Sequence, residues 1–225
     1  MNDSTVHRIL RSLSKSGLVQ QRSQDRRYAI GPLCFELALS QAPYFAFQRE
    51  CLAYLNNIAR VSGWHAYAFL KSGTETVCIQ RLYVSSEQSM VDVGMRRPLA
   101  GTAYGIAILL SMSATERKSA LLDNRRALRL LQESNPNRHY GEMLKVSKER
   151  GFGLNINMVA NAVGSIGIPL LDSRHVPYGA FGVSGSHKEF SPARIARAVA
   201  SLRNEATAIA AEQPLLVEEM TRMHH

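Results

Sequence analysis

The chain has 225 residues, of which 45% are hydrophobic and 20% charged, as in an ordinary globular protein. This composition excludes a wholly disordered chain, a collagen-like chain and a coiled-coil rod. Lysine and arginine number 27 against 18 acidic residues, and the net charge of +9 fits either a polyanionic partner or a basic surface without a specific partner.

Cysteine usage and hydropathy favour a cytoplasmic protein without a membrane span. Cys34, Cys51 and Cys78 follow no metal-binding spacing and are too few for a secreted disulfide framework. The N-terminus has no apolar signal core. The two long uncharged stretches, 98–115 and 151–171, are interrupted by proline and by glycine or asparagine, so neither predicts a transmembrane helix.

The first predicted element is a helix that is capped by Asp3 or Ser4 and ends before Gly17. Its apolar residues form one stripe, made by Val6, Ile9, Leu10 and Leu13. The opposite face is polar and basic, with Ser4, Arg8, Arg11 and Lys15. A short hairpin is predicted next, with strands at 18–21 and 27–30 and a basic turn between them.

This basic N-terminal region is a candidate DNA-binding surface. Residues 1–31 carry six lysine and arginine side chains against two acidic ones. Such a helix fits the major groove, and its N-terminal N–H groups and the basic hairpin can contact phosphates. The candidate DNA-binding residues are Ser4, Thr5, His7, Arg8, Arg11, Lys15, Arg22, Arg26 and Arg27. The alternative interpretation is a solvated charged helix beside a hairpin.

The rest of the chain predicts two connecting helices and then a mixture of strands and helices. Pro32 starts a helix to about Ser40, and a longer helix over 46–61 ends at Gly63, with a domain boundary near 43–47. Strands are predicted at 64–70, 76–82, 89–93, 154–159, 163–171 and 176–184. Helices are predicted at 102–112, from the capping box Ser113 to Glu116, at 137–150, and from Ser191-Pro192 to Glu212. This order favours an α+β sheet domain.

Several short segments carry a family resemblance. In the N-terminal region they are Ser4-Thr5-Val6-His7-Arg8-Ile9-Leu10, Gly17-Leu18-Val19 and Arg27-Tyr28-Ala29-Ile30-Gly31. Further along they are Arg97-Pro98-Leu99-Ala100-Gly101-Thr102-Ala103-Tyr104-Gly105, Arg150-Gly151-Phe152-Gly153, Ile168-Pro169-Leu170 and Gly182-Val183-Ser184-Gly185. In their order and spacing these segments resemble IclR-type transcriptional regulators over most of the chain.

The resemblance implies an α+β fold in three parts. They are a partial winged helix-turn-helix at 1–31, a linker helix at 32–46 and an effector-binding domain at 47–225. The last would be a GAF-like or profilin-like domain with a central antiparallel sheet. In the family two other helices precede the recognition helix, so we expect an N-terminally incomplete motif, from a truncated chain or a misplaced start. Such a motif would bind DNA weakly or not at all.

The resemblance also implies a pocket for a small metabolite between the sheet and nearby loops. Gly101, Thr102 and Ala103 open a helix whose N–H groups can receive a carboxylate. The implied effector-binding residues are Leu99, Gly101, Thr102, Ala103, Leu154, Asn155, Met158, Ser165, Gly182 and Ser184.

The sequence departs from the family at several pocket positions. Family members often have histidine in place of Ala100, lysine in place of Ile106, cysteine in place of Ser165 and acidic residues across 155–158. This loss of charge favours a neutral or less anionic ligand, or no ligand. For Asn155 and Asn157, solvent exposure or turn formation is the alternative to a role in the pocket.

No catalytic motif supports an enzyme. The seven histidines form neither H-x-x-x-H nor H-E-x-x-H, and the segment 182–186 misses G-x-S-x-G at its last position. There is no Walker A motif and no dinucleotide fingerprint. We therefore predict no catalytic residue, no metal site and no cofactor.

Together these patterns predict a DNA-binding transcriptional regulator that senses a small organic acid or a less charged analogue. Its partners would be double-stranded operator DNA, the effector and further copies of the chain, as a dimer or tetramer. The apolar residues that would bury in such an interface, or else pack on their own domain, are Leu33, Phe35, Leu37, Leu39, Tyr44, Phe45 and Phe47. The alternative function is a stand-alone sensing or oligomerisation module without DNA binding.

Overall fold

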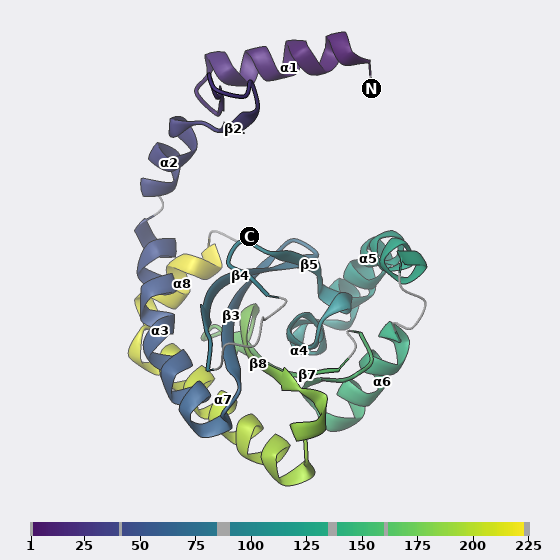
Figure 1. Cartoon of the computed structure of the whole chain (residues 1–225). Coiled ribbons are helices and arrows are strands. Elements are labelled where there is room, and N and C mark those ends of the chain that lie inside the picture. Colours follow the sequence, from purple (N-terminus) through teal and green to yellow (C-terminus); the bar gives the residue numbers. More distant parts are fainter. Residues whose placement is uncertain (1, 41, 85–90, 135–138, 160–161, 223–225) are drawn as a thin grey trace. The chain divides into compact units, whose positions relative to one another are not determined.

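The structure is a computed structural model that describes residues 2–40, 42–84, 91–134, 139–159 and 162–222 (Figure 1). The chain forms two compact units, residues 1–45 and 46–225, called here the N-terminal and C-terminal units. The finer division into 1–31, 32–46 and 47–225 stays a prediction.

The N-terminal unit contains helix α1 (Asp3–Lys15), a two-stranded antiparallel hairpin of β1 (Val19–Gln21) and β2 (Tyr28–Ile30), and helix α2 (Pro32–Leu39). The predicted cap of α1 was wrong by one or two residues, because the side chain of Asn2 accepts the backbone N–H of Ser4. Gly17 follows the helix with φ of +80°, as predicted for a glycine that ends a helix.

A close approach of two backbone segments links α1 to α2. The Gly31 amide donates to the Leu18 carbonyl at 2.8 Å, and the Leu33 amide donates to the Gly17 carbonyl at 3.2 Å. A side chain at Gly31 would overlap the backbone of Gly17. Glycine is therefore required at this crossing.

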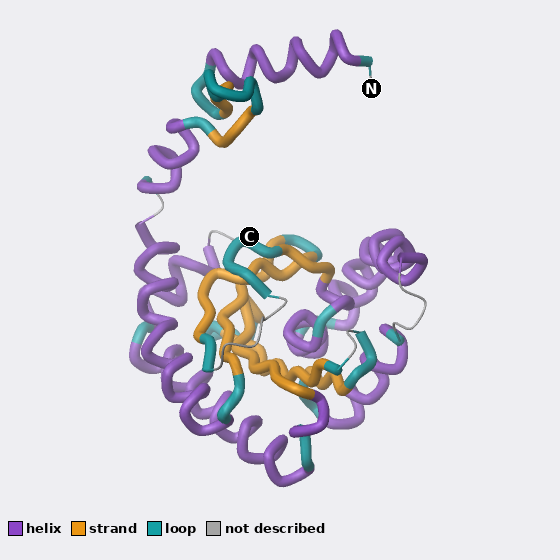
Figure 2. The backbone as a smooth tube through the Cα atoms, viewed as in Figure 1, coloured by secondary structure: helices purple, strands orange, loops and turns teal. Residues whose placement is uncertain are grey.

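The C-terminal unit is built on one six-stranded antiparallel sheet with the order β5-β4-β3-β8-β7-β6. Figure 2 shows the strands of this sheet in orange, with purple helices around them. Its strands are β3 (His65–Ser72), β4 (Glu75–Leu82), β5 (Arg96–Pro98), β6 (Gly153–Ile156), β7 (Val163–Leu171) and β8 (Pro177–Ser186). The sheet curls around α4 (Ala103–Ser111), and α4 lies on the same side as α5 (Ala114–Ser134) and α6 (Tyr140–Arg150) (Figure 1). The opposite side carries α3 (Ala42–Ser62), α7 (Pro192–Glu212) and α8 (Pro214–Arg222).

Local signals account for the starts of α5 and α7. The predicted capping box is present, since Ser113 Oγ donates to Glu116 Oε2 at 2.7 Å and Glu116 N donates to Ser113 Oγ at 3.3 Å. Ser191 caps α7 ahead of Pro192 as predicted, and its hydroxyl accepts the amide of Arg194 at 3.4 Å.

Two predicted strands need correction, and one helix was not predicted. The strand predicted at 154–159 is β6, which ends at Ile156 because Asn157 has φ of +58°. The strand predicted at 89–93 lies partly outside the described residues, and its described part, 91–93, forms a loop and turn. The edge strand is instead β5 at Arg96–Pro98, which pairs with β4. Helix α8 was not predicted.

The single tryptophan joins the start of α7 to the sheet. The ring of Trp64 stacks on Phe190 with centroids 3.9 Å apart, and its Nε1 donates to Glu189 Oε2 at 2.9 Å. The guanidinium of Arg194 lies 4.7 Å from the centre of the same ring. Among the described residues, no helix is long and apolar enough to cross a membrane.

Candidate functional site

Two rows of residues cross the sheet beneath α4. The first, called the glycine row, contains Gly182, Gly167 and Gly153, which are in register across β8, β7 and β6. The second, called the polar row, lies two residues away from the first on each of these strands and continues onto β3. It contains His65, Ser184, Ser165 and Asn155, from β3, β8, β7 and β6. Because side chains alternate between faces, both rows face α4.

The glycine row lets the first turn of α4 lie directly on the strands. A Cβ atom built at Gly153 would overlap the carbonyl oxygen of Ala103, and one built at Gly167 would lie 2.7 Å from the same oxygen. A Cβ atom at Gly182 would overlap the ring of Tyr104. The absence of side chains along this row thus sets the height of the helix above the sheet.

The polar row is buried, with 4–8% exposure for each of its four residues. The Asn155 Nδ2 donates to the Val163 carbonyl at 3.3 Å and to Ser165 Oγ at 3.4 Å. The Asn155 Oδ1 accepts the backbone amides of Met158 and Val159 at 3.0 and 3.1 Å. Asn155 therefore shapes the loop after β6 as well as facing α4.

The other half of the polar row is bonded to β3 and to the loop after β4. The hydroxyl of Ser184 donates to the hydroxyl of Tyr67 at 3.1 Å, and the backbone amide of Val84 donates to His65 Nδ1 at 3.1 Å. None of the four side chains in the row carries a permanent charge. The row can offer hydroxyl and imidazole groups to a polar ligand, since the amide of Asn155 is already bonded on both its oxygen and its nitrogen.

Tyr104 of α4 reaches down onto this row. It is 4% exposed, and its hydroxyl shares hydrogen bonds with Ser184 and Ser165. Its ring stacks on Phe69 with centroids 4.2 Å apart and an angle of 20°. Burial is the main cause that raises the pKa of Tyr104 well above its usual value, and the neighbouring Tyr67 raises it further.

The structure places the predicted effector residues of the α4 region at the start of this helix. Thr102 caps α4, since its Oγ1 accepts the Gly105 amide at 2.9 Å, and that N–H is therefore not available to a carboxylate. Ala103 rests on the glycine row, whereas Gly101 lies against Leu128 and Pro98. Leu99 is fully buried in a hydrophobic cluster with Tyr104 and its neighbours.

Two predicted wall residues do not join the polar row. Leu154 is in register with Ile166 and Val183, so it lies on the opposite face of the sheet from Asn155. The side chain of Met158 packs against a cluster formed by Ile106, Tyr140 and Met143. The described geometry thus brings together Ala103, Asn155, Ser165, Gly182 and Ser184 from the predicted set.

Sequence reasoning missed three members of the site: His65, Tyr67 and Tyr104. Tyr104 lies inside the matched segment 97–105 and was available as a signal. His65 and Tyr67 pair with Ser184 and Gly182, which follow them by more than one hundred residues. No local pattern reveals a pairing over that separation.

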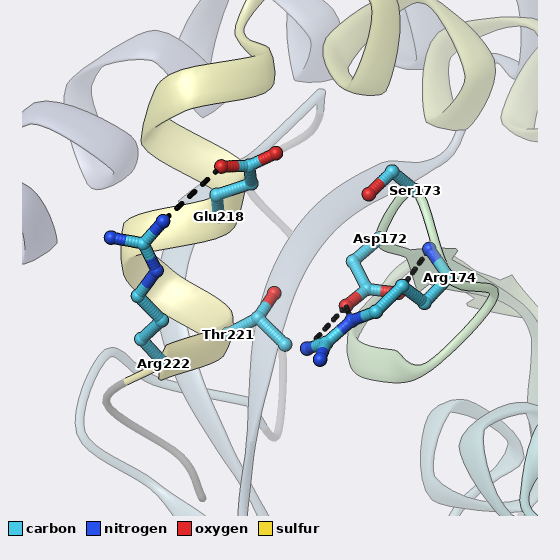
Figure 3. Close-up of a pocket in the computed structure, with 6 residues that line it drawn as sticks. All are labelled: Asp172, Ser173, Arg174, Glu218, Thr221 and Arg222. Carbon is cyan, nitrogen blue, oxygen red and sulfur yellow. Dashed lines mark hydrogen bonds and ion pairs between the residues drawn. The ribbon is translucent and has the colours of Figure 1, made fainter.

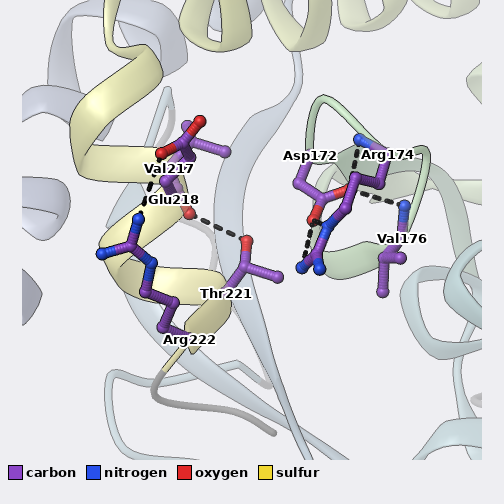
Figure 4. A network of polar contacts seen from close by, with 7 residues as sticks. All are labelled: Asp172, Arg174, Val176, Val217, Glu218, Thr221 and Arg222. Carbon is purple, nitrogen blue, oxygen red and sulfur yellow. Dashed lines mark hydrogen bonds and ion pairs between the residues drawn. The ribbon is translucent and has the colours of Figure 1, made fainter.

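A hollow of about 240 Å³ lies away from this row, between α8 and the turn that joins β7 to β8 (Figure 3). It is lined by Asp172, Ser173, Arg174, Glu218, Thr221 and Arg222. The buried carboxylate of Asp172 accepts the amides of Arg174 and Val176, and Arg174 also forms an ion pair with it at 3.3 Å (Figure 4). Glu218 pairs with Arg222 at 3.5 Å. These charges compensate one another, and no predicted site residue lines the hollow.

The candidate DNA-binding residues all lie in the N-terminal unit. On α1, Arg8, Arg11 and Lys15 are exposed and form no ion pair within the described part of the chain. In the hairpin, Asp25 pairs with Arg22 at 2.9 Å and with Arg27 at 3.8 Å, so two of the three arginines there are partly neutralised. Arg26 has φ of +60° at the turn.

Potential metal ligands and thiols can be placed within the residues that the structure covers. No group of three or more histidine, cysteine or acidic side chains is positioned to hold a metal ion there. Cys51 and Cys78 are buried, and burial raises the pKa of the Cys78 thiol to about 12.

Comparisons with known proteins agree on one family. Residues 47–211 match the family model "Bacterial transcriptional regulator IclR C-terminal". The chain is 28% identical over 189 residues to a glycerol operon regulatory protein of Streptomyces griseus, an alignment that covers 84% of this chain and 74% of that protein.

Solved structures support the same fold. A Silicibacter sp. protein assigned to the IclR regulators aligns with a TM-score of 0.75 at 19% identity, covering 98% of this chain and 84% of its own. An IclR homologue from Microbacterium hydrocarbonoxydans, complexed with 4-hydroxybenzoate, aligns with a TM-score of 0.68 at 16% identity, covering 93% and 85%.

Proposed function

Because the chain belongs to the IclR family of bacterial transcriptional regulators, we propose that it binds operator DNA through its N-terminal unit and responds to a small molecule at the polar row. The relatives found are regulators, in agreement with the prediction that the chain is not an enzyme. Such a regulator would act in the cytoplasm, where its DNA lies.

The exposed basic face of α1 is the observation that supports DNA binding. Arg8, Arg11 and Lys15 project to solvent without ion-pair partners among the described residues, so they are available to phosphates and base edges. Ser4, Thr5 and His7 lie on the same helix, near its N-terminus, where backbone amides favour an anion. In the hairpin, Arg26 is the arginine left outside the Asp25 ion pairs, while Arg22 and Arg27 would exchange Asp25 for phosphate.

The experiment is fluorescence anisotropy of the full chain on labelled duplex DNA from upstream of its own gene. We expect affinity to fall steeply between roughly 50 mM and 200 mM salt. The double variant Arg8→Ala/Arg11→Ala should lose about tenfold or more in affinity and have a shallower salt dependence. The matched control is Arg125→Ala/Arg129→Ala, which removes the same charge from exposed positions of α5. Equal losses for both variants would contradict a specific role for α1.

The polar row supports a ligand with few charges. The row offers two serine hydroxyls and one imidazole beside the first turn of α4, while the Asn155 amide is bonded to β7 and to the loop after β6. A carboxylate would find no permanent positive charge on these side chains, whereas a hydroxyl or amide group would find partners. We therefore propose a small organic acid or, better matched, its less charged analogue.

A pair of probes tests this ligand class. The neighbour complexed with 4-hydroxybenzoate suggests that acid and its neutral amide, 4-hydroxybenzamide. Calorimetry should show tighter binding of the amide, and Ser165→Ala should weaken it. Ser201→Ala, at a buried serine of α7, is the matched control. Tighter binding of the acid would contradict the proposed preference.

Assembly into a dimer or tetramer is supported by apolar side chains around α2. Phe35, Leu37 and Leu39 are each more than half exposed, and Phe45 is 46% exposed. Phe47 is different, because it is fully buried and its ring contacts Tyr178 edge-on at 5.8 Å. Phe47 therefore packs within the C-terminal unit and is not part of the proposed interface. Leu33 and Tyr44 are partly buried.

One observation favours the second candidate function, a sensing or oligomerisation module without DNA binding. No residue of α1 is buried, and Ile9 of its apolar stripe is 44% exposed. A recognition helix that is not held against a core would lose entropy on binding DNA. Absent DNA binding together with intact ligand binding would support this function instead.

A further inference from the structure

We propose that the space above Gly182 and beside the two serines of the polar row is a binding site for a hydroxyphenyl group, and that the chain fills it with its own Tyr104. The side chain acts as a tethered ligand, so a free ligand enters only by displacing it. This inference rests on the proposed function solely in assigning the polar row to ligand binding.

The fit of the ring is the first argument. Gly182 leaves open the volume that the Tyr104 ring occupies, and any side chain there would overlap the ring. Phe69 covers one face of the ring by stacking at 4.2 Å, and Tyr67 lies beside it at 6.0 Å. Stacked and tilted aromatic neighbours of this kind bind a flat ring well.

The hydroxyl is the second argument. Tyr104 ends on Ser165 and Ser184, two small side chains that face each other across β7 and β8. A small residue with a hydroxyl is well suited to hold a phenolic group at a fixed depth, since it leaves room and supplies a partner. The site therefore selects both the shape and the polar end of a hydroxyphenyl group.

A second buried tyrosine provides a comparison for Tyr104. Tyr178 is 1% exposed, yet its hydroxyl has no hydrogen-bond partner among the described residues. Both tyrosines fill buried volume, but only the position of Tyr104 supplies partners for the hydroxyl. The two positions thus form a matched pair for an experiment.

Competition with a tethered side chain predicts a large change in affinity. The tether gives Tyr104 a high effective concentration at the site, so it reduces the apparent affinity of any free ligand. Tyr104→Ala removes this competitor and leaves a cavity with the same walls. We expect p-cresol, which has the shape of the tyrosine side chain, to bind Tyr104→Ala at least tenfold more tightly than it binds the wild-type chain.

The test measures p-cresol and toluene binding to the full chain by calorimetry and by thermal unfolding. Tyr104→Ala should lower the melting temperature by roughly 10 °C, and saturating p-cresol should restore several degrees. Toluene, which lacks the hydroxyl, should bind Tyr104→Ala less tightly than p-cresol. In Tyr178→Ala the two compounds should bind equally or not at all.

Equal affinity of p-cresol for wild type and Tyr104→Ala would overturn the proposal, as would equal binding of toluene and p-cresol by Tyr104→Ala. If Tyr104→Ala does not fold, Tyr104→Phe and Ser184→Ala are compared singly and together. A double variant that loses less stability than the sum of the singles supports the bonded hydroxyl, and strict additivity overturns it. None of these measurements uses DNA, so they stand or fail separately from operator binding.

Discussion

At the scale of single residues, Asn155 both faces the candidate site and holds the loop after β6 in place. Its side-chain oxygen accepts two backbone amides of the loop after β6, and its nitrogen reaches across to β7. Among family members this stretch is often acidic, and a carboxylate could accept the same two amides but could not donate to the Val163 carbonyl. The amide of Asn155 therefore suits a site that has fewer charged side chains than is usual in the family.

We expect Asn155→Ala to lower the free energy of unfolding by about 1–3 kcal/mol, because two buried amides lose their acceptor. Urea unfolding followed by circular dichroism measures this change. Asn204→Ala, at an exposed position of α7, is the control and should change stability by less than about 0.5 kcal/mol. Similar losses in both variants would show that Asn155 does not organise its loop.

The buried thiol of Cys78 and the buried hydroxyl of Tyr104 make the free energy of unfolding decrease at alkaline pH. Burial raises the pKa of the Cys78 thiol from 9.0 to about 12, so the folded chain holds this proton where the unfolded chain has lost it. The stabilisation is complete below pH 9 and is lost as the pH rises from 9 toward 12. Tyr104, whose pKa is also raised, adds a loss that begins above pH 10.

The corresponding measurement is the urea midpoint between pH 8 and pH 11. We expect Cys78→Ala to flatten the decline above pH 9, with an upper limit of about 1.4 kcal/mol per pH unit for one group. Cys34→Ala, which removes a half-buried thiol of the N-terminal unit, is the control. An unchanged slope in Cys78→Ala would contradict the assignment.

At the scale of elements, α4 packs directly on the glycine row, with no room for a side chain between them. The helix carbonyl of Ala103 lies over Gly153 and Gly167, so even one methyl group on either strand must lift the helix. Lifting α4 would also withdraw Tyr104 from the polar row. The packing of the helix and the state of the candidate site are therefore coupled.

Gly167→Ala should destabilise the chain by about 1–3 kcal/mol or more through overpacking. The control is Gly141→Ala in the first turn of α6, where an added methyl group meets nothing within 4 Å. That change should leave stability unaltered or raise it by up to about 1 kcal/mol, since alanine favours a helix. Thermal unfolding of both variants gives the comparison, and a Gly167→Ala chain as stable as wild type would disprove close packing.

The sequence predicted elements best where their ends carry local chemistry. Two helix starts were predicted from their caps, Ser113 with Glu116 and Ser191 with Pro192. Each cap is formed by residues that are adjacent or three apart in the sequence, so it can be recognised locally. The edge strand β5 was missed, since Arg96 and Arg97 are exposed and give no alternating apolar signal. Helix α8 was missed because only Gln213 separates it from α7.

The candidate site was also predicted only in part, because some of its residues come together only through long-range strand pairing. Asn155, Ser165 and Ser184 came from the family resemblance, and the registers of β6, β7 and β8 bring them into one row. The partners His65 and Tyr67 depend on the pairing of β3 with β8, which is a tertiary contact. Leu154 was predicted to form a pocket wall but lies on the face of the sheet away from α4. The register of β6 decides which of two adjacent residues faces α4, and the sequence alone does not give that register.

At the scale of the whole molecule, the exposed apolar residues of α2 predict self-association. Phe35 and Leu39 are four residues apart and so lie on one side of the helix, with 66% and 56% exposure. We expect the wild-type chain to be a dimer or larger, and Phe35→Ser/Leu39→Ser to shift it toward monomer. Size-exclusion chromatography with light scattering measures the mass.

Leu215→Ser provides the control for this prediction. Leu215 is 79% exposed on α8, so its replacement removes an equally accessible apolar side chain from another surface. A monomeric wild-type chain, or equal dissociation of both variants, would contradict an interface at α2.

The placement of Trp64 has a spectroscopic consequence. As the only tryptophan of the chain, stacked on Phe190 and bonded to Glu189 in the C-terminal unit, it dominates intrinsic fluorescence. Emission excited near 295 nm therefore follows the melting of the sheet unit, while the N-terminal unit, with Tyr28 and Tyr44 as its aromatic phenols, is silent at that wavelength. The chain thus carries an intrinsic optical reporter that distinguishes the unfolding of one unit from that of the other.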